Sequence, residues 1–80
     1  MVKHVVITGA AGQLGRVVCR EFLAAGYFVH ALISKHDTSE WDLSSGFISV
    51  HKLDLTDKLE VEQFTGLLKQ SKIAVHAALL

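Results

Sequence analysis

The chain has 80 residues, half of them apolar, and its eight basic and eight acidic residues give a net charge of zero. This length allows one small domain, and the dispersed, balanced charge gives no reason to expect a nucleic-acid or anionic-membrane partner. No apolar run approaches the ~20 residues of a membrane helix, and there is no signal-peptide pattern. The single cysteine, Cys19, excludes an internal disulfide, so we expect a cytoplasmic chain in a reducing compartment.

The N-terminal part of the chain predicts a strand, a glycine-rich turn, a helix and a second strand. Val2–Ile7 is short and rich in β-branched residues, as in a buried strand. After the turn at Thr8–Gly15, apolar residues recur at helical spacing, which predicts a helix over Gly12–Ala25 with Gly26 as its C′ residue. Tyr27–Ile33 predicts the second strand, and a helix of this length between two strands indicates a parallel βαβ unit.

The connection that follows is polar and carries no apolar stripe. We expect Ser34–Gly46 to be a loop with one turn near Glu40–Leu43. Trp41 lies in this stretch, and because large aromatic side chains supply packing area, we expect it to hold the loop against the domain.

The second half of the chain predicts one more strand, helix and strand. Phe47–Leu53 predicts the third strand, and Asp57 followed three residues later by Glu60 resembles a capping box that opens a helix. Gly66 inside this helix should cost about 1 kcal/mol relative to alanine. Ile73–Ala78 predicts a fourth strand.

These elements predict an α/β fold built on a parallel sheet of four strands. Right-handed crossovers place the strands in the order 3-2-1-4, with two helices, one on each face of the sheet. In this arrangement the fourth strand is an apolar edge, and unpaired apolar edges favour self-association.

The turn at Thr8–Gly15 carries the functional hypothesis. Glycines let the backbone turn sharply and approach a pyrophosphate, and the free N–H groups of the following helix N-terminus face the anion. The strand before it and the helix after it favour a dinucleotide site over a structural turn with incidental glycines.

Three stretches together resemble a known family. They are Thr8-Gly-x-x-Gly-x-x-Gly15, Leu53-Asp54-Leu55-Thr56-Asp57 and Val75-His76-Ala77-Ala78. In this order they resemble the short-chain dehydrogenase/reductases, especially the extended and atypical branches that include NAD-dependent epimerases and dehydratases. The resemblance covers the whole chain but only the N-terminal part of the family's domain. It implies a partial Rossmann fold in which residues 1–80 are the N-terminal part of an NAD(P)-binding domain.

The resemblance also implies roles for individual positions. Backbone N–H groups of the glycine turn would hold the pyrophosphate, Asp54 would accept a hydrogen bond from the adenine amino group, and the Leu55 backbone would lie beside it. Two small residues of the fourth strand would lie against the cofactor. With the end of the second strand, the predicted cofactor-binding residues are Gly9, Ala11, Gly12, Gln13, Leu14, Gly15, Ser34, Lys35, Asp54, Leu55, Ala77 and Ala78.

The choice between NAD and NADP is predicted at the end of the second strand. An acid there binds the ribose 2′-hydroxyl of NAD, but this chain has Ser34 and Lys35. Lys35 could neutralise a 2′-phosphate, with help from Arg16, so the sequence favours NADP. Asp37, slightly later, keeps NAD open.

No catalytic residue is predicted in these 80 residues. The resemblance implies a tyrosine with a lysine four residues later, but the only tyrosine is Tyr27 and Ala31 follows it at that spacing. The five histidines are scattered without metal-ligand spacing, which favours strand or surface histidines and no metal site. Three hypotheses stay open: the cofactor-binding piece of an oxidoreductase or epimerase, a non-catalytic nucleotide-binding or regulatory form, and a fragment that self-associates through its fourth strand.

Overall fold

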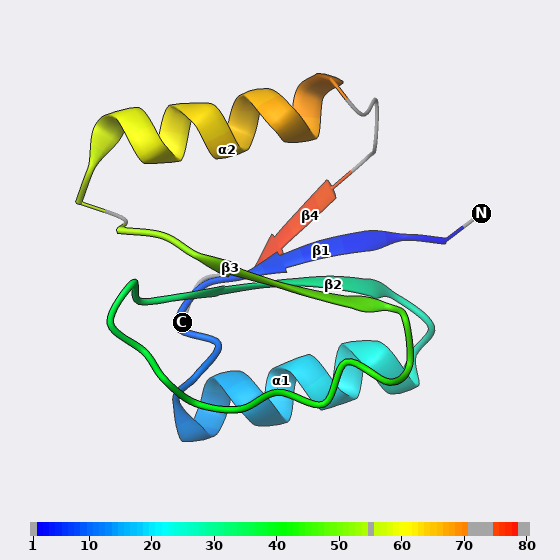
Figure 1. The fold of residues 1–80 in the computed structure, drawn as a ribbon. Helices are drawn as coiled ribbons and strands as arrows, with labels where there is room; N and C mark the ends of the chain where they lie inside the picture. The colour runs from blue at the N-terminus through cyan, green and yellow to red at the C-terminus, as the bar shows by residue number, and fades with distance from the viewer. Residues whose placement is uncertain (1, 55, 71–74, 79–80) are drawn as a thin grey trace.

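The computed structural model describes residues 2–54, 56–70 and 75–78, which form an α/β fold around a parallel sheet (Figure 1). The elements in chain order are β1 (His4–Ile7), α1 (Gln13–Ala24), β2 (Phe28–Ile33), β3 (Ile48–Lys52), α2 (Lys58–Gln70) and β4 (Val75–Ala78). Neighbouring strands pair in parallel, and the sheet order is β3-β2-β1-β4. The α/β class and the parallel sheet predicted from the sequence are confirmed.

The two helices cover opposite faces of the sheet (Figure 1). Side chains alternate along a strand, so neighbouring residues of β1 separate into two cores. Val5 and Ile7 belong to the core that contains Cys19 of α1, whereas Val6 belongs to the core that contains Phe64 of α2. Each face of the sheet is therefore closed by its own helix.

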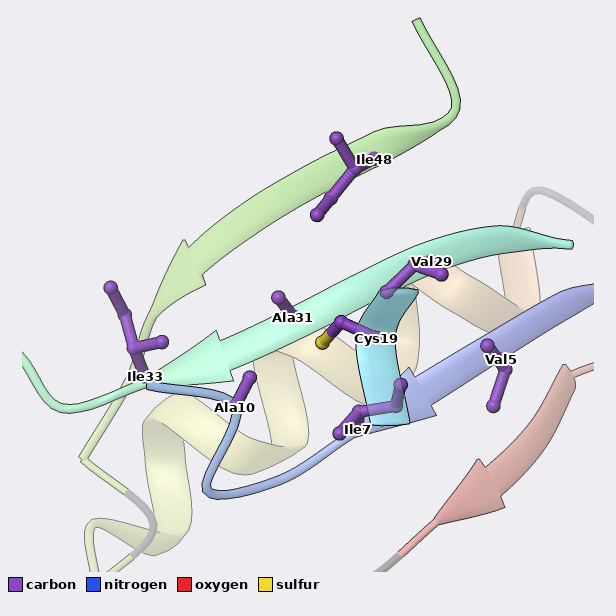
Figure 2. Close-up of a cluster of buried hydrophobic side chains, with 8 residues drawn as sticks. All are labelled: Val5, Ile7, Ala10, Cys19, Val29, Ala31, Ile33 and Ile48. Carbon is purple, nitrogen blue, oxygen red and sulfur yellow. The ribbon is translucent and has the colours of Figure 1, made fainter. Parts of the chain in front are cut away.

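The core beneath α1 is apolar throughout (Figure 2). Its buried members are Val5, Ile7, Ala10, Cys19, Val29, Ala31, Ile33 and Ile48. Cys19 is the member contributed by α1, and burial raises the pKa of its thiol. Cys19 is therefore a small buried core residue.

The C-terminus of α1 is closed by backbone hydrogen bonds. Gly26 has φ +88°, and its N–H donates to the Leu23 carbonyl at 3.0 Å. The Tyr27 N–H reaches back to the Phe22 carbonyl at 3.0 Å, which completes the double bond pattern of a Schellman motif. The predicted C′ glycine is confirmed.

Residues 34–47 form no helix, as expected, but the turn predicted at Glu40–Leu43 is wrong. The turns lie at residues 35–36 and 44–45. Each is fixed by a short polar side chain: Ser34 Oγ accepts from the His36 N–H at 3.3 Å, and Asp42 Oδ1 accepts from the Ser44 N–H at 3.0 Å. Trp41 packs against the α1-face core, as predicted.

The N-terminus of α2 forms half of the predicted capping box. Asp57 Oδ1 accepts from the Leu59 N–H at 3.0 Å and the Glu60 N–H at 3.4 Å. The other half of the box, a bond from the Asp57 N–H to the Glu60 side chain, is not needed. The Asp57 N–H donates instead to the Asp54 carbonyl at 3.0 Å. The Glu60 carboxylate is paired with Lys35 instead, at 2.7 Å.

Three histidines that are scattered in the sequence form a row across the sheet on the α2 side. His4 Nδ1 lies 3.1 Å from His30 Nε2, and His30 Nδ1 lies 3.4 Å from His51 Nε2. Phe28 stacks on His4 at one end, and Phe64 of α2 meets His51 edge-on at the other. Among the described residues, no group of three or more histidine, cysteine or acidic side chains has metal-binding geometry.

Candidate functional site

A cavity of about 460 Å³ lies where β1, β2 and β3 end. Six of the predicted cofactor-binding residues line it: Gly9, Ala11, Gly12, Ser34, Lys35 and Asp54. Its other lining residues, absent from the prediction, are Leu32, Ile33, His36, Asp37 and Leu53. All five are sequence neighbours of predicted residues at strand ends, so extending each predicted segment by two residues would have included them. Ligand sites of open parallel sheets lie at this carboxyl edge.

The glycine turn forms one wall of the cavity. Gly9 has φ +62°, the left-handed region that favours glycine, and its carbonyl accepts from the Gly12 N–H at 3.2 Å. The Ala10 N–H donates to the Leu32 carbonyl at 3.3 Å and ties the turn to β2. These bonds hold the turn in place at the end of the sheet.

Gly12 is the N-cap of α1 and lines the cavity. No side chain caps this helix end, and its first turn contains no acidic residue. A helix N-terminus in this state carries unsatisfied N–H groups and a partial positive charge, and it suits an anion. A Cβ placed on Gly12 would meet only the Gly9 carbonyl oxygen within 4 Å, at an ordinary 3.5 Å. The chain's own packing therefore tolerates a methyl group there.

The next three predicted residues, in the first turn of α1, do not line the cavity. Gln13 and Leu14 are exposed, and Gly15 is buried against the glycine turn. A Cβ on Gly15 would lie 2.1 Å from the Gly9 carbonyl oxygen and 2.7 Å from the Ala10 Cα. The absence of a side chain at Gly15 is thus required for α1 to approach the turn.

Asp54 lies at the rim of the cavity just after β3. Its Oδ1 accepts from the Thr56 N–H at 2.9 Å and from the Thr56 hydroxyl at 2.6 Å. These hydrogen bonds lower the pKa of Asp54, with further help from the charge of Lys35. Asp54 is therefore held in place as a carboxylate.

Two of the remaining predicted positions lie in β4. Ala77 and Ala78 of β4 pair with Val6 and Ile7 of β1, which places their backbone beside the strand that leads into the glycine turn. Leu55 lies outside the described residues.

The residues that follow β2 bring opposite charges to the cavity. Lys35 Nζ lies 2.7 Å from Glu60 Oε1, and this hydrogen bond raises the pKa of Lys35. Asp37 Oδ1 accepts from the Ser39 N–H at 2.7 Å and also from the Ser39 hydroxyl, and these bonds lower the pKa of Asp37. Lys35, the one lysine among the described residues of the cavity lining, is therefore already paired within the chain.

A second cavity, of about 450 Å³, lies between α1 and the loop that precedes β3. Arg16, Arg20 and Trp41 contribute to its lining. The Arg16 guanidinium stands over the Trp41 ring at 4.4 Å, and its Nε donates to the Ala11 carbonyl at 3.3 Å. Arg16, expected near the 2′ position, thus lines this cavity and not the first. Because the two volumes are nearly equal, the chemistry of the lining distinguishes the cavities.

Comparison with known proteins identifies the family of the chain. The model of the NAD dependent epimerase/dehydratase family matches residues 5–80. The chain belongs to this family. No curated protein matches the chain significantly. Within the described residues, no helix has the length and apolar character to cross a membrane.

Two solved structures resemble the chain. A short chain dehydrogenase from Leptospira borgpetersenii, solved with bound NAD+, is 27% identical with a TM-score of 0.75 over 90% of the chain. A candidate epimerase from Burkholderia cenocepacia is 20% identical with a TM-score of 0.70 over 98% of the chain, and this likeness concerns the fold. The chain spans 28% of the first structure's length and 24% of the second's.

Proposed function

We propose that the chain binds the adenosine and pyrophosphate part of a nicotinamide dinucleotide in the cavity at the ends of β1, β2 and β3. One observation carries the proposal: the cavity joins an uncapped helix N-terminus at Gly12 to a fixed carboxylate at Asp54. The first suits a pyrophosphate and the second suits an amino group that donates a hydrogen bond. Its volume lies in the ordinary range of small-molecule sites.

Membership of the family and the NAD+ bound to the Leptospira relative support a nicotinamide dinucleotide as the ligand. In this proposal the chain is the N-terminal part of an NAD(P)-binding domain, and any oxidoreductase or epimerase activity belongs to a longer protein. The alternative hypothesis, a non-catalytic nucleotide-binding form, relies on the same cavity. Self-association through β4, an edge strand of the sheet, stays a prediction.

The preference for NADP also stays a prediction. Lys35 favours it because an ammonium group can neutralise a 2′-phosphate. The ion pair with Glu60 and the presence of Asp37 in the cavity lining oppose it, since both place negative charge near that phosphate.

Gly12→Ala tests the proposed site. The methyl group is tolerated by the chain but enters the surface on which the pyrophosphate would lie. We expect the affinity for NADH, measured by calorimetric titration, to fall about tenfold or more, as for a loss of roughly 1.4 kcal/mol. The thermal midpoint should change by only a few degrees.

Gly66→Ala is the matched control, because it adds the same methyl group in α2, where a Cβ meets no atom within 4 Å. It should bind NADH as the wild-type chain does. Equal affinities of the wild-type chain and the Gly12→Ala variant would contradict the proposed site, and absence of saturable binding to the wild-type chain would contradict the proposed function.

A further inference from the structure

We propose that Glu60 is a positioning residue that sets the dinucleotide preference of the cavity by holding Lys35, an inference that rests on the proposed function. Glu60 lies in α2, outside the cavity lining, and is linked to the lining by its ion pair with Lys35. It therefore differs from the selecting position expected from the sequence, at the end of the second strand.

Lys35 is the only lysine or arginine among the described residues that line the cavity. Its ammonium group is therefore the one fixed positive charge that the lining offers to a 2′-phosphate. Glu60 Oε1 holds this group at 2.7 Å. The Lys35 side chain is about half exposed (49%), whereas the Glu60 side chain is 21% exposed. The carboxylate is thus the more enclosed partner of the pair.

The second oxygen of Glu60 strengthens the pair. Glu60 Oε2 is buried and has no hydrogen-bond partner among the described residues. A buried carboxylate with one unsatisfied oxygen depends on its remaining cation, since loss of that cation would leave its charge uncompensated. Release of Lys35 to a ligand phosphate therefore carries a cost at Glu60.

Carboxylates other than Glu60 also act on Lys35. Asp54 and Asp57 also act on it electrostatically, and Asp37 lies in the cavity lining. A phosphate monoester that approached Lys35 would meet these carboxylates in addition to Glu60. A ribose 2′-hydroxyl carries no charge and meets no such opposition. The pair consequently weakens binding of a 2′-phosphate while leaving binding of a 2′-hydroxyl unchanged.

The test compares adenosine 2′,5′-bisphosphate with 5′-AMP, two probes that differ only by the 2′-phosphate. Glu60→Gln removes the charge but keeps the shape of the side chain and leaves the Asp57 cap intact. We expect it to raise the affinity for the bisphosphate about fivefold or more, as for about 1 kcal/mol, while 5′-AMP affinity changes less than twofold.

Glu62→Gln is the matched control. It removes the same charge from the same helix, but Glu62 pairs with Lys58 at 3.9 Å and its side chain is 60% exposed. Its affinity ratio for the two probes should equal that of the wild-type chain. In the double variant Lys35→Gln, Glu60→Gln the gain for the bisphosphate should disappear, because Lys35 is the group that is released.

Equal ratios in the Glu60→Gln and Glu62→Gln variants would overturn the proposal, and so would a gain that persists without Lys35. If Glu60→Gln disturbs folding, the variant Lys35→Gln tests the other partner of the ion pair. We expect it to lower the affinity for the bisphosphate selectively. An equal loss of affinity for both probes would contradict the proposal. Failure of the wild-type chain to bind either probe would overturn the proposed function itself. A normal affinity for 5′-AMP with an unchanged ratio would overturn only the role of Glu60.

Discussion

The two faces of the sheet are held by different physical interactions. On the α1 face, eight buried apolar residues pack together, and Gly15 brings the helix against the glycine turn (Figure 2). On the α2 face, the buried apolar cluster of the described residues contains Val6, Leu32 and Phe64. The same face carries the row of His4, His30 and His51.

The stability of the two faces should therefore respond to different changes: one to added side-chain volume and the other to pH. The α1 face depends on close packing, so its stability should respond to added volume and little to pH. The α2 face contains His30, whose pKa is lowered mainly by burial, and the Lys35–Glu60 pair, so its stability should respond to protonation. The candidate site combines the glycine turn, which packs against α1, with Lys35, which is paired with Glu60 of α2.

The largest expected effect is that of Gly15→Ala on the α1 face. Its Cβ would lie 2.1 Å from a backbone oxygen, so either α1 or the glycine turn must move. We expect a loss of about 3 kcal/mol in the free energy of unfolding, measured by urea denaturation. A stability within 0.5 kcal/mol of the wild-type value, roughly the range of a neutral surface change, would show that the α1 face is loosely packed.

Acidification should destabilise the α2 face. Burial, together with the neighbouring charges of His51 and His4, lowers the pKa of His30 from its ordinary 6.5 to about 4. The unfolded chain therefore binds a proton that the folded chain does not, and stability falls as the pH drops from about 6.5 towards 4. Between pH 7 and pH 5, we expect His30 to cost roughly 2 kcal/mol of unfolding free energy.

His30→Phe isolates this effect, because phenylalanine keeps an aromatic ring but does not titrate. Its urea midpoint should lose most of the pH dependence between pH 7 and pH 5, and the lowered pKa of His51 accounts for the remainder. His36→Gln, at an exposed histidine outside the row, is the control for the replacement of a histidine. The same pH slope in the His30→Phe variant and the wild-type chain would contradict the assignment.

The sequence alone predicts most of the α1 face. Hydrophobic periodicity, the C′ glycine and the glycine turn all depend on neighbours in the chain, and these predictions agree with the structure. The histidine row was missed because it needs the register of three strands: His30 pairs with Val6, and His51 pairs with Leu32. Strand parity would have placed the three rings on one face, but only the register brings them into contact.

The ion pair between Lys35 and Glu60 was missed for a similar reason. Lys35 and Glu60 are 25 positions apart in the numbering, and they belong to the loop after β2 and to α2. Capping preference predicted that Glu60 would turn back to Asp57, but the Asp54 carbonyl already satisfies the Asp57 N–H. A tertiary ion pair therefore replaced a local hydrogen bond, which local sequence patterns cannot anticipate.

The smallest expected effect is a gain of stability on the α2 side. Gly66 lies inside α2, and a Cβ there meets no atom within 4 Å. Gly66→Ala should raise the free energy of unfolding by about 0.5 to 1 kcal/mol, because alanine loses less conformational freedom in a helix. A loss of stability in the same urea experiment would mean that this helix surface is covered.

Amide resonances followed by NMR during titration with NAD+ test the proposed site most directly. Saturable shifts are expected at the backbone amides of Gly9, Gly12, Ser34 and Lys35, which line the cavity at the strand ends. The amides of Arg20 and Ser44, in the second cavity of nearly equal volume, should not shift. Shifts centred on the second cavity, or no saturable shift anywhere, would contradict a dinucleotide site at the ends of β1, β2 and β3.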